Sequence, residues 1–71
     1  MNKLTKRQKQ ILSLFYFENR VIANKLNLQE STVKTHSNDI KNILNMDSKT
    51  KCLIYALKKG ILKLEEIETD F

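Results

Sequence analysis

The chain has 71 residues, enough for one small domain, and 41% of them are hydrophobic, which is typical of a folded domain rather than a disordered segment. One Gly and no Pro favour helices over hairpins. The lone Cys52 cannot form an internal disulfide, and with a single His it cannot complete a metal site. Because the sequence also lacks a catalytic cluster, a membrane-spanning run and a signal peptide, we expect a cytoplasmic protein that is not an enzyme and has no cofactor, metal or membrane partner.

The positive charge is unevenly distributed along the chain. Residues 1–60 hold 12 of the 13 Lys and Arg but four of the eight acids, a net charge of +8. Residues 61–71 hold one Lys and four acids, a net charge of −3. A basic body favours a polyanion such as nucleic acid as the partner, although a solvated basic surface would have the same composition.

The first predicted helix follows Thr5-Lys-Arg-Gln8, a capping box with Gln in place of Glu, and runs to about Phe15 or Phe17. Glu18 and Asn19 connect it to a second helix, about residues 20–26, whose apolar residues recur at one-turn spacing. Asn27 ends this helix, because Asn tolerates the left-handed conformation.

The third predicted helix spans about residues 31–44 and is amphipathic. Val33, Ile40 and Leu44 form its apolar stripe, and Asn45 ends it as Asn27 ends the second helix. We expect a small, polar and basic face opposite that stripe, made of Ser31, Thr32, Lys34, Thr35, Ser37, Asn38 and Lys41. Such a face can enter a DNA major groove, where Lys and Asn hydrogen-bond base edges and a Thr methyl can pack on a thymine methyl.

The fourth predicted helix spans about residues 49–59, capped by Asp47 or Ser48 and ended by Gly60. Cys52 and Ala56 are small enough to approach the third helix closely. A second apolar ridge on this helix either closes the core or binds a partner, and it consists of Leu53, Ile54 and Leu57. The acidic tail that follows has Leu64, Ile67 and Phe71 at helical spacing, so it either forms a short amphipathic helix or frays.

The run Ile22-Ala-Asn-Lys-Leu-Asn-Leu-Gln-Glu-Ser-Thr-Val-Lys-Thr-His36 closely resembles the LuxR/GerE-type DNA-binding domain, most specifically over residues 31–36. The resemblance extends to the flanking runs, covers residues 4 to about 62, and argues against a sigma region-4 unit. It implies an all-α, four-helix fold with a helix-turn-helix over residues 1–62, followed by the tail at 63–71. Relatives have a longer first turn with a Gly, for which a left-handed Asn19 could substitute.

The resemblance also implies site residues. Those expected to face bases are Lys34, Thr35 and Asn38. Those expected to contact phosphates are Arg20, Ser31, Thr32, His36, Lys41 and Lys49, and His36 could equally pack structurally. Those expected in a dimer interface on the fourth helix are Thr50, Leu53, Ile54 and Leu57.

Two functions remain open at this point. The first is a stand-alone bacterial transcription regulator that binds an inverted repeat in double-stranded DNA as a homodimer, since the resemblance begins close to Met1. The second is an adaptor whose fourth helix and tail bind RNA polymerase or another regulator. The base-facing residues favour the first, because an adaptor does not need them.

Overall fold

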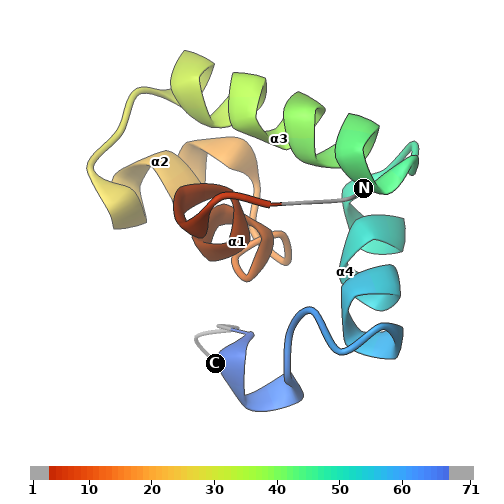
Figure 1. Cartoon of the computed structure of the whole chain (residues 1–71). Helices are drawn as coiled ribbons and strands as arrows, with labels where there is room; N and C mark the ends of the chain where they lie inside the picture. Colours follow the sequence, from red (N-terminus) through yellow and green to blue (C-terminus); the bar gives the residue numbers. More distant parts are fainter. Residues whose placement is uncertain (1–3, 68–71) are drawn as a thin grey trace.

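The computed structural model describes residues 4–67 of the chain, and every element in that range is helical. Four α-helices follow one another: α1 (Lys6–Leu12), α2 (Asn19–Leu26), α3 (Glu30–Leu44) and α4 (Lys49–Lys58) (Figure 1). A short 3-10 turn, η1 (Leu64–Glu66), comes last. The predicted all-α fold is therefore confirmed.

The start of α1 has the predicted capping box. The Thr5 hydroxyl accepts from the Gln8 backbone N–H at 3.0 Å, and the Gln8 side chain accepts from the Thr5 N–H at 2.9 Å. The predicted end of α1 at Phe15 or Phe17 is wrong, because the helix stops at Leu12. After Leu12, backbone N–H groups bond to the carbonyl three residues earlier, as in a 3-10 helix. This compact turn buries Leu14 and Phe15.

Left-handed Asn residues follow both α2 and α3, as predicted. Asn27 has φ 57° and Asn45 has φ 56°. The next residue after each of them bonds back to the helix, Leu28 N–H to the Ala23 carbonyl at 2.8 Å and Met46 N–H to the Lys41 carbonyl at 2.9 Å. These turns satisfy carbonyls that would otherwise lack partners at the helix ends.

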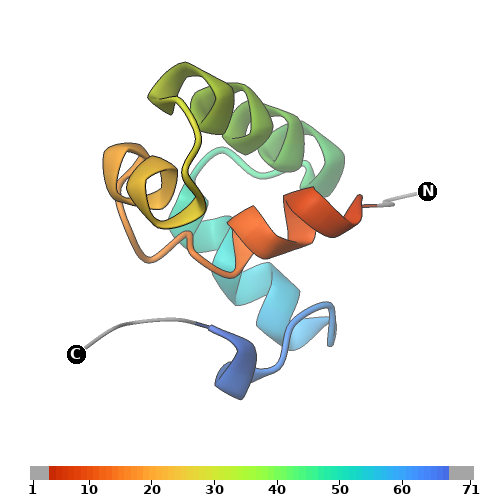
Figure 2. The ribbon, with the colours of Figure 1, turned by 90° about the vertical axis from the view of Figure 1, so that its left-hand side faces the viewer.

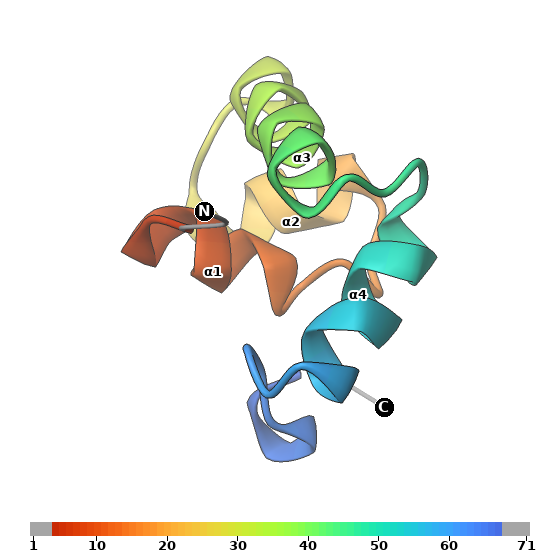
Figure 3. The ribbon, with the colours of Figure 1, turned by 45° about the vertical axis from the view of Figure 1, so that its right-hand side comes forward.

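The core lies where α3 packs across α1, α2 and α4 (Figures 2 and 3). The predicted apolar stripe of α3 is buried there, together with Cys52 and Ala56 of α4. The buried apolar residues are Ile11, Leu12, Leu14, Phe15, Ile22, Ala23, Val33, Ile40, Leu44, Cys52, Ala56 and Leu62. Because α3 contacts three other helices, its orientation and the position of its outer side are fixed by the core.

Asn19 does not adopt the left-handed conformation predicted for it. It is the first residue of α2, and the positive φ values of non-Gly residues among those described belong to Asn27 and Asn45. Its side-chain Oδ1 instead accepts from Ser37 of α3 at 3.3 Å and from the Lys49 ammonium of α4 at 3.2 Å. Ser37 is accordingly buried, which corrects its predicted place on the exposed face of α3.

The segment after α4 folds back toward α1. Gly60, with φ 73°, allows this reversal, and Leu62 is buried in the core. Leu64 and Ile67 were predicted on one face of a helix, but η1 is a single turn that ends at Glu66. Leu64 is 75% exposed, whereas Ile67, the residue after η1, packs against the core. Phe71, the third residue of that predicted face, lies outside the described residues. Within residues 4–67, none of the helices has the length and apolarity that crossing a bilayer requires.

Candidate nucleic-acid interface

The outer side of α3 faces away from the other elements of the described chain (Figure 3). Three residues predicted to face bases, Lys34, Thr35 and Asn38, are exposed on it, and so is Ser31. Thr32, His36 and Lys41 are half-buried and flank this stripe. The helix thus separates a buried apolar side from an open polar side, and the open side can approach a groove without rearrangement of the core.

One residue of this face was missed by the sequence reasoning. Asn42 is exposed one turn beyond Asn38, so the stripe of Lys34 and Asn38 continues toward the end of α3. The signal was present in the helical period, because Asn42 follows Asn38 at a spacing of four. Its carboxamide can donate and accept, as base edges require.

The hydroxyl of Thr35 is already used within the helix. Its Oγ1 donates to the carbonyl of Ser31, one turn earlier, at 3.1 Å. Lys34 and Asn38, on either side of Thr35 along the face, differ from it because their polar groups lie at the ends of longer side chains. The face therefore carries the polar groups of Lys34 and Asn38 and, between them, the short side chain of Thr35, whose hydroxyl is bonded to the backbone of α3.

His36 lies half-buried at the edge of the face. Its Nδ1 is buried, and within the described part of the chain that atom has no hydrogen-bond partner. This leaves Nε2 as the ring nitrogen for an external contact. The arrangement is compatible with both roles predicted for His36, the phosphate contact and the structural one.

Lys49 was predicted to contact a phosphate at the start of α4, but its ammonium already has protein acceptors. It donates to the backbone carbonyl of Phe17 and to Asn19 Oδ1, and it lies 5.4 Å from the centre of the Phe15 ring. Burial lowers the pKa of Lys49, an effect opposed by nearby Glu18 and reinforced by Lys41. A phosphate contact by Lys49 would have to compete with these bonds.

Other basic residues were also predicted to contact phosphates. Arg20 is exposed in the first turn of α2, which contains no acid. Lys41 lies toward the end of α3, in a shallow hollow that also includes Asp47 and Lys51 of the next segment. The Lys51 ammonium lies 3.0 Å from the Asp47 carboxylate and lowers the pKa of Asp47. Lys41 thus lies beside an ion pair between Asp47 and Lys51.

The predicted dimer residues on α4 differ in exposure. Thr50 is exposed and Ile54 is 49% exposed, whereas Leu53 and Leu57 are half-buried. Leu53 packs against the core, in keeping with the alternative that part of this ridge closes the domain. Ile54 is therefore the large apolar side chain of α4 that is most exposed to solvent.

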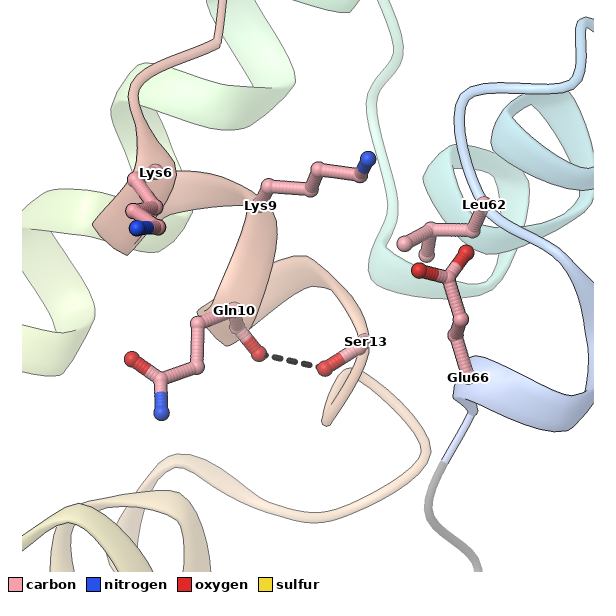
Figure 4. Close-up of a pocket in the computed structure, with 6 residues that line it drawn as sticks. All are labelled: Lys6, Lys9, Gln10, Ser13, Leu62 and Glu66. Carbon is pink, nitrogen blue, oxygen red and sulfur yellow. Dashed lines mark hydrogen bonds between the residues drawn. The ribbon is translucent and has the colours of Figure 1, made fainter.

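Another hollow lies between α1 and the C-terminal segment (Figure 4). It has a volume of about 580 Å³ and is lined by Lys6, Lys9, Gln10, Ser13, Leu62 and Glu66. The Ser13 hydroxyl donates to the Gln10 carbonyl at 2.6 Å, so it is occupied in ending α1. Within residues 4–67, no three His, Cys, Asp or Glu side chains are grouped so that they could hold a metal ion.

Comparison with known proteins agrees with this arrangement. Residues 2–56 match the family described as bacterial regulatory proteins, luxR family. The chain is 41% identical over 61 residues to the oxygen regulatory protein NreC of Staphylococcus carnosus, and 36% identical over 61 residues to the uncharacterized transcriptional regulatory protein YxjL of Bacillus subtilis. It is 32% identical over 63 residues to the transcriptional regulatory protein DegU of Brevibacillus brevis. These alignments cover 83–86% of the chain, which spans 27–28% of the length of the relatives.

Proposed function

The chain belongs to the luxR family of bacterial regulatory proteins, and on that basis we propose that it is a sequence-specific DNA-binding transcription regulator. In this proposal α3 enters the major groove of double-stranded DNA and reads bases with Lys34, Thr35 and Asn38. The relatives are bacterial, and we extend that source, and a place in the cytoplasm beside the chromosome, to this chain.

The observation that carries the proposal is the open polar face of α3. A helix can read bases only if one side is free of its own domain, and Lys34, Thr35 and Asn38 are exposed together on such a side. The net charge of +5 adds a general attraction to phosphates. Both features are needed, because charge alone supports binding that is indifferent to sequence.

Phosphate contacts would fix the register of α3 in the groove. We assign them to the exposed Arg20 and Ser31 and to the half-buried Thr32, His36 and Lys41. Lys49 remains a predicted contact of this kind, but its two protein acceptors support a different role. We propose that Lys49 positions the start of α4 against the start of α2, because its ammonium joins these two elements.

We further propose that two copies bind an inverted repeat through α4. The support is the half-exposed Ile54 beside the exposed Thr50 on the surface of this helix. Burial of an aliphatic side chain of that size against a partner contributes about 1 kcal/mol or more. Half-site spacing in the DNA would then report the distance between the two copies of α3.

The test is selection of DNA from a random pool, followed by affinity measurements across a salt series. Lys34→Ala should weaken binding to the selected site by about 1–3 kcal/mol and relax the preference at one position. Lys58→Ala is the matched control, because Lys58 is an exposed lysine in the last turn of α4. That end of α4 lies away from α3 (Figure 1). If both variants lose the same small amount and no site is selected, the base-reading proposal is wrong.

One observation favours the adaptor as a second candidate. Leu64 is 75% exposed beside the acidic residues Glu65 and Glu66, a combination suited to a basic and apolar partner surface such as one on RNA polymerase or another regulator. Leu64→Glu would then abolish capture of that partner while leaving DNA selection unchanged. The regulator and the adaptor are thus distinguished by which surface, α3 or the C-terminal segment, is needed for activity.

A further inference from the structure

The hollow between α1 and the C-terminal segment brings basic residues together with an apolar side chain (Figure 4). Lys6 and Lys9 lie about one turn apart on the α1 wall, and Leu62 and Glu66 form the facing wall. Figure 4 shows the Lys9 side chain extending from α1 toward that facing wall. Within residues 4–67, neither lysine takes part in an ion pair. Both ammonium groups can therefore bind a carboxylate from another molecule.

The charges in the hollow favour an acidic partner. Glu66 is the acid among the lining residues, and its Oε1 already accepts from the Lys63 backbone N–H at 2.7 Å. Two ammonium groups and one carboxylate give the hollow a net charge of +1. The stretch from Thr5 to Phe17 contains no Asp or Glu, so α1 has no carboxylate of its own to offset the two lysines.

The C-terminal segment carries an apolar side chain and an acid on its exposed part. Leu64 is 75% exposed, the highest value among the large apolar side chains of the described residues. Glu65, beside it, is exposed and has no ion pair within residues 4–67. A single exposed Leu is ordinary on a protein surface. This one differs because Leu64 and Glu65 lie in sequence between Leu62 and Glu66, the residues that form one wall of the hollow.

Two copies of the chain can therefore supply each other with the missing groups. We propose that this surface is a self-association site, in which Leu64 of each copy enters the hollow of the other and Glu65 pairs with Lys9. A surface that carries both halves of a contact is self-complementary, and a two-fold axis closes the contact at two copies. The site is separate from the proposed α4 contact, so the pairing through Ile54 does not depend on it.

This contact is small, and we expect it to be weak. It involves one face of a seven-residue helix and one short segment, whereas stable interfaces bury about 1,200–2,000 Å². Free copies should then associate only at high concentration, near about 1 mM. Copies held side by side on DNA would meet at a higher effective concentration and fill neighbouring sites cooperatively. That consequence rests on the proposed function, whereas the self-association itself does not.

The experiment uses the 71-residue chain with Ile54→Glu, which removes the proposed α4 contact, and it needs no DNA. Sedimentation equilibrium at up to about 1 mM chain and low salt should show a dimer, which higher salt should weaken by screening. Lys9→Glu and Glu65→Lys should each weaken association about fivefold or more, because each brings like charges together at two equivalent places.

Lys34→Glu is the matched control for these charge changes. Lys34 is an exposed lysine on α3, and α3 lies at the opposite end of the molecule from the C-terminal segment (Figures 1 and 3). The variant carries the same change of charge as Lys9→Glu, so it reports any general effect of charge on association. We expect it to associate like the parent chain.

A mixture of the two interface variants gives the sharpest result. When Lys9→Glu chains meet Glu65→Lys chains, opposite charges face each other again, so association should return to the level of the parent chain. Mixing would not repair a folding defect in either variant. If the parent chain stays monomeric, if either variant associates as well as the parent, or if the mixture stays as weak as its components, the self-association site is wrong. None of these results bears on DNA selection, so the proposed function would stand.

Discussion

The ammonium of Lys49 donates to the side-chain oxygen of Asn19 at 3.2 Å, which ties the first turn of α4 to the first turn of α2. The same oxygen accepts from Ser37 of α3 at 3.3 Å. One carboxamide therefore joins three helices, including the helix that carries the proposed base-reading face. This group therefore contributes to the relative orientation of α3 and α4, and so of the proposed base-reading face and the proposed dimer face.

Removal of the carboxamide should destabilise the domain. Asn19→Ala leaves the half-buried Lys49 ammonium with one fewer acceptor and the buried Ser37 hydroxyl without its acceptor, and we expect a loss of about 1–3 kcal/mol in the free energy of unfolding. Urea denaturation measures it. Asn24→Ala, an exposed position on the same helix, is the matched control and should change stability by less than about 0.5 kcal/mol. Equal effects of the two variants would mean that the Asn19 bonds contribute nothing.

The partial burial of Lys49 predicts a pH dependence with a definite sign. Burial lowers the pKa of Lys49 in the folded chain below its ordinary value of 10.5, so the unfolded chain holds the proton more strongly. Between the lowered pKa and 10.5 the unfolded state binds more protons, and stability therefore rises with pH through this group. Subtraction of the Lys49→Met unfolding curve from that of wild type isolates the effect, because the other groups cancel. A difference that falls with rising pH would contradict it.

Cys52 should react slowly with thiol reagents while the domain is folded. The residue is fully buried, and burial raises the pKa of its thiol, so both access and the reactive thiolate are suppressed. We expect modification at the rate of unfolding and a large acceleration in urea. Asn42→Cys in a Cys52→Ala background places a thiol on the exposed face of α3 and should react at once. Equal rates for the two thiols would show that the α3–α4 contact opens readily.

Ile54 should matter for pairing of two chains but not for folding. Ile54→Glu places a charge on a side chain that is 49% exposed, so the domain should keep its stability while a second copy is repelled. We expect tight binding to an inverted repeat to fall to the level of a single half-site. Leu64→Glu carries the same charge change on another exposed residue and should leave pairing intact. Sedimentation with full and half sites gives the readout.

Local features of the sequence predicted most of the elements and the helix ends. Asn27 and Asn45 were predicted to be left-handed from their position after apolar periodic runs, and both are. That argument is reliable because a helix end needs only nearby backbone groups. The alternation of buried and exposed residues on α3 also followed from its period, apart from Ser37, which is buried, and Thr32 and Lys41, which are half-buried.

Long-range polar contacts were not predictable in the same way. Asn19 looked like another left-handed turn residue, but its oxygen is used by Ser37 and Lys49, 18 and 30 residues further along the chain. α1 also ends earlier than predicted, at Leu12, and the turn after it buries Leu14 and Phe15 in the core. A periodic pattern does not specify such partners, so the roles of Asn19, Ser37 and Lys49 required the structure.

The shared acceptor on Asn19 also bears on how long the protein survives in a cell. Opening of α2, α3 or α4 alone would strand the same buried donors, so partial opening costs a large share of the free energy of complete unfolding. A protease that needs an extended segment would then cleave only chains in which the whole domain has unfolded. Proteolytic turnover of this domain would follow its global stability, and occupancy of the proposed DNA site would prolong its lifetime by mass action.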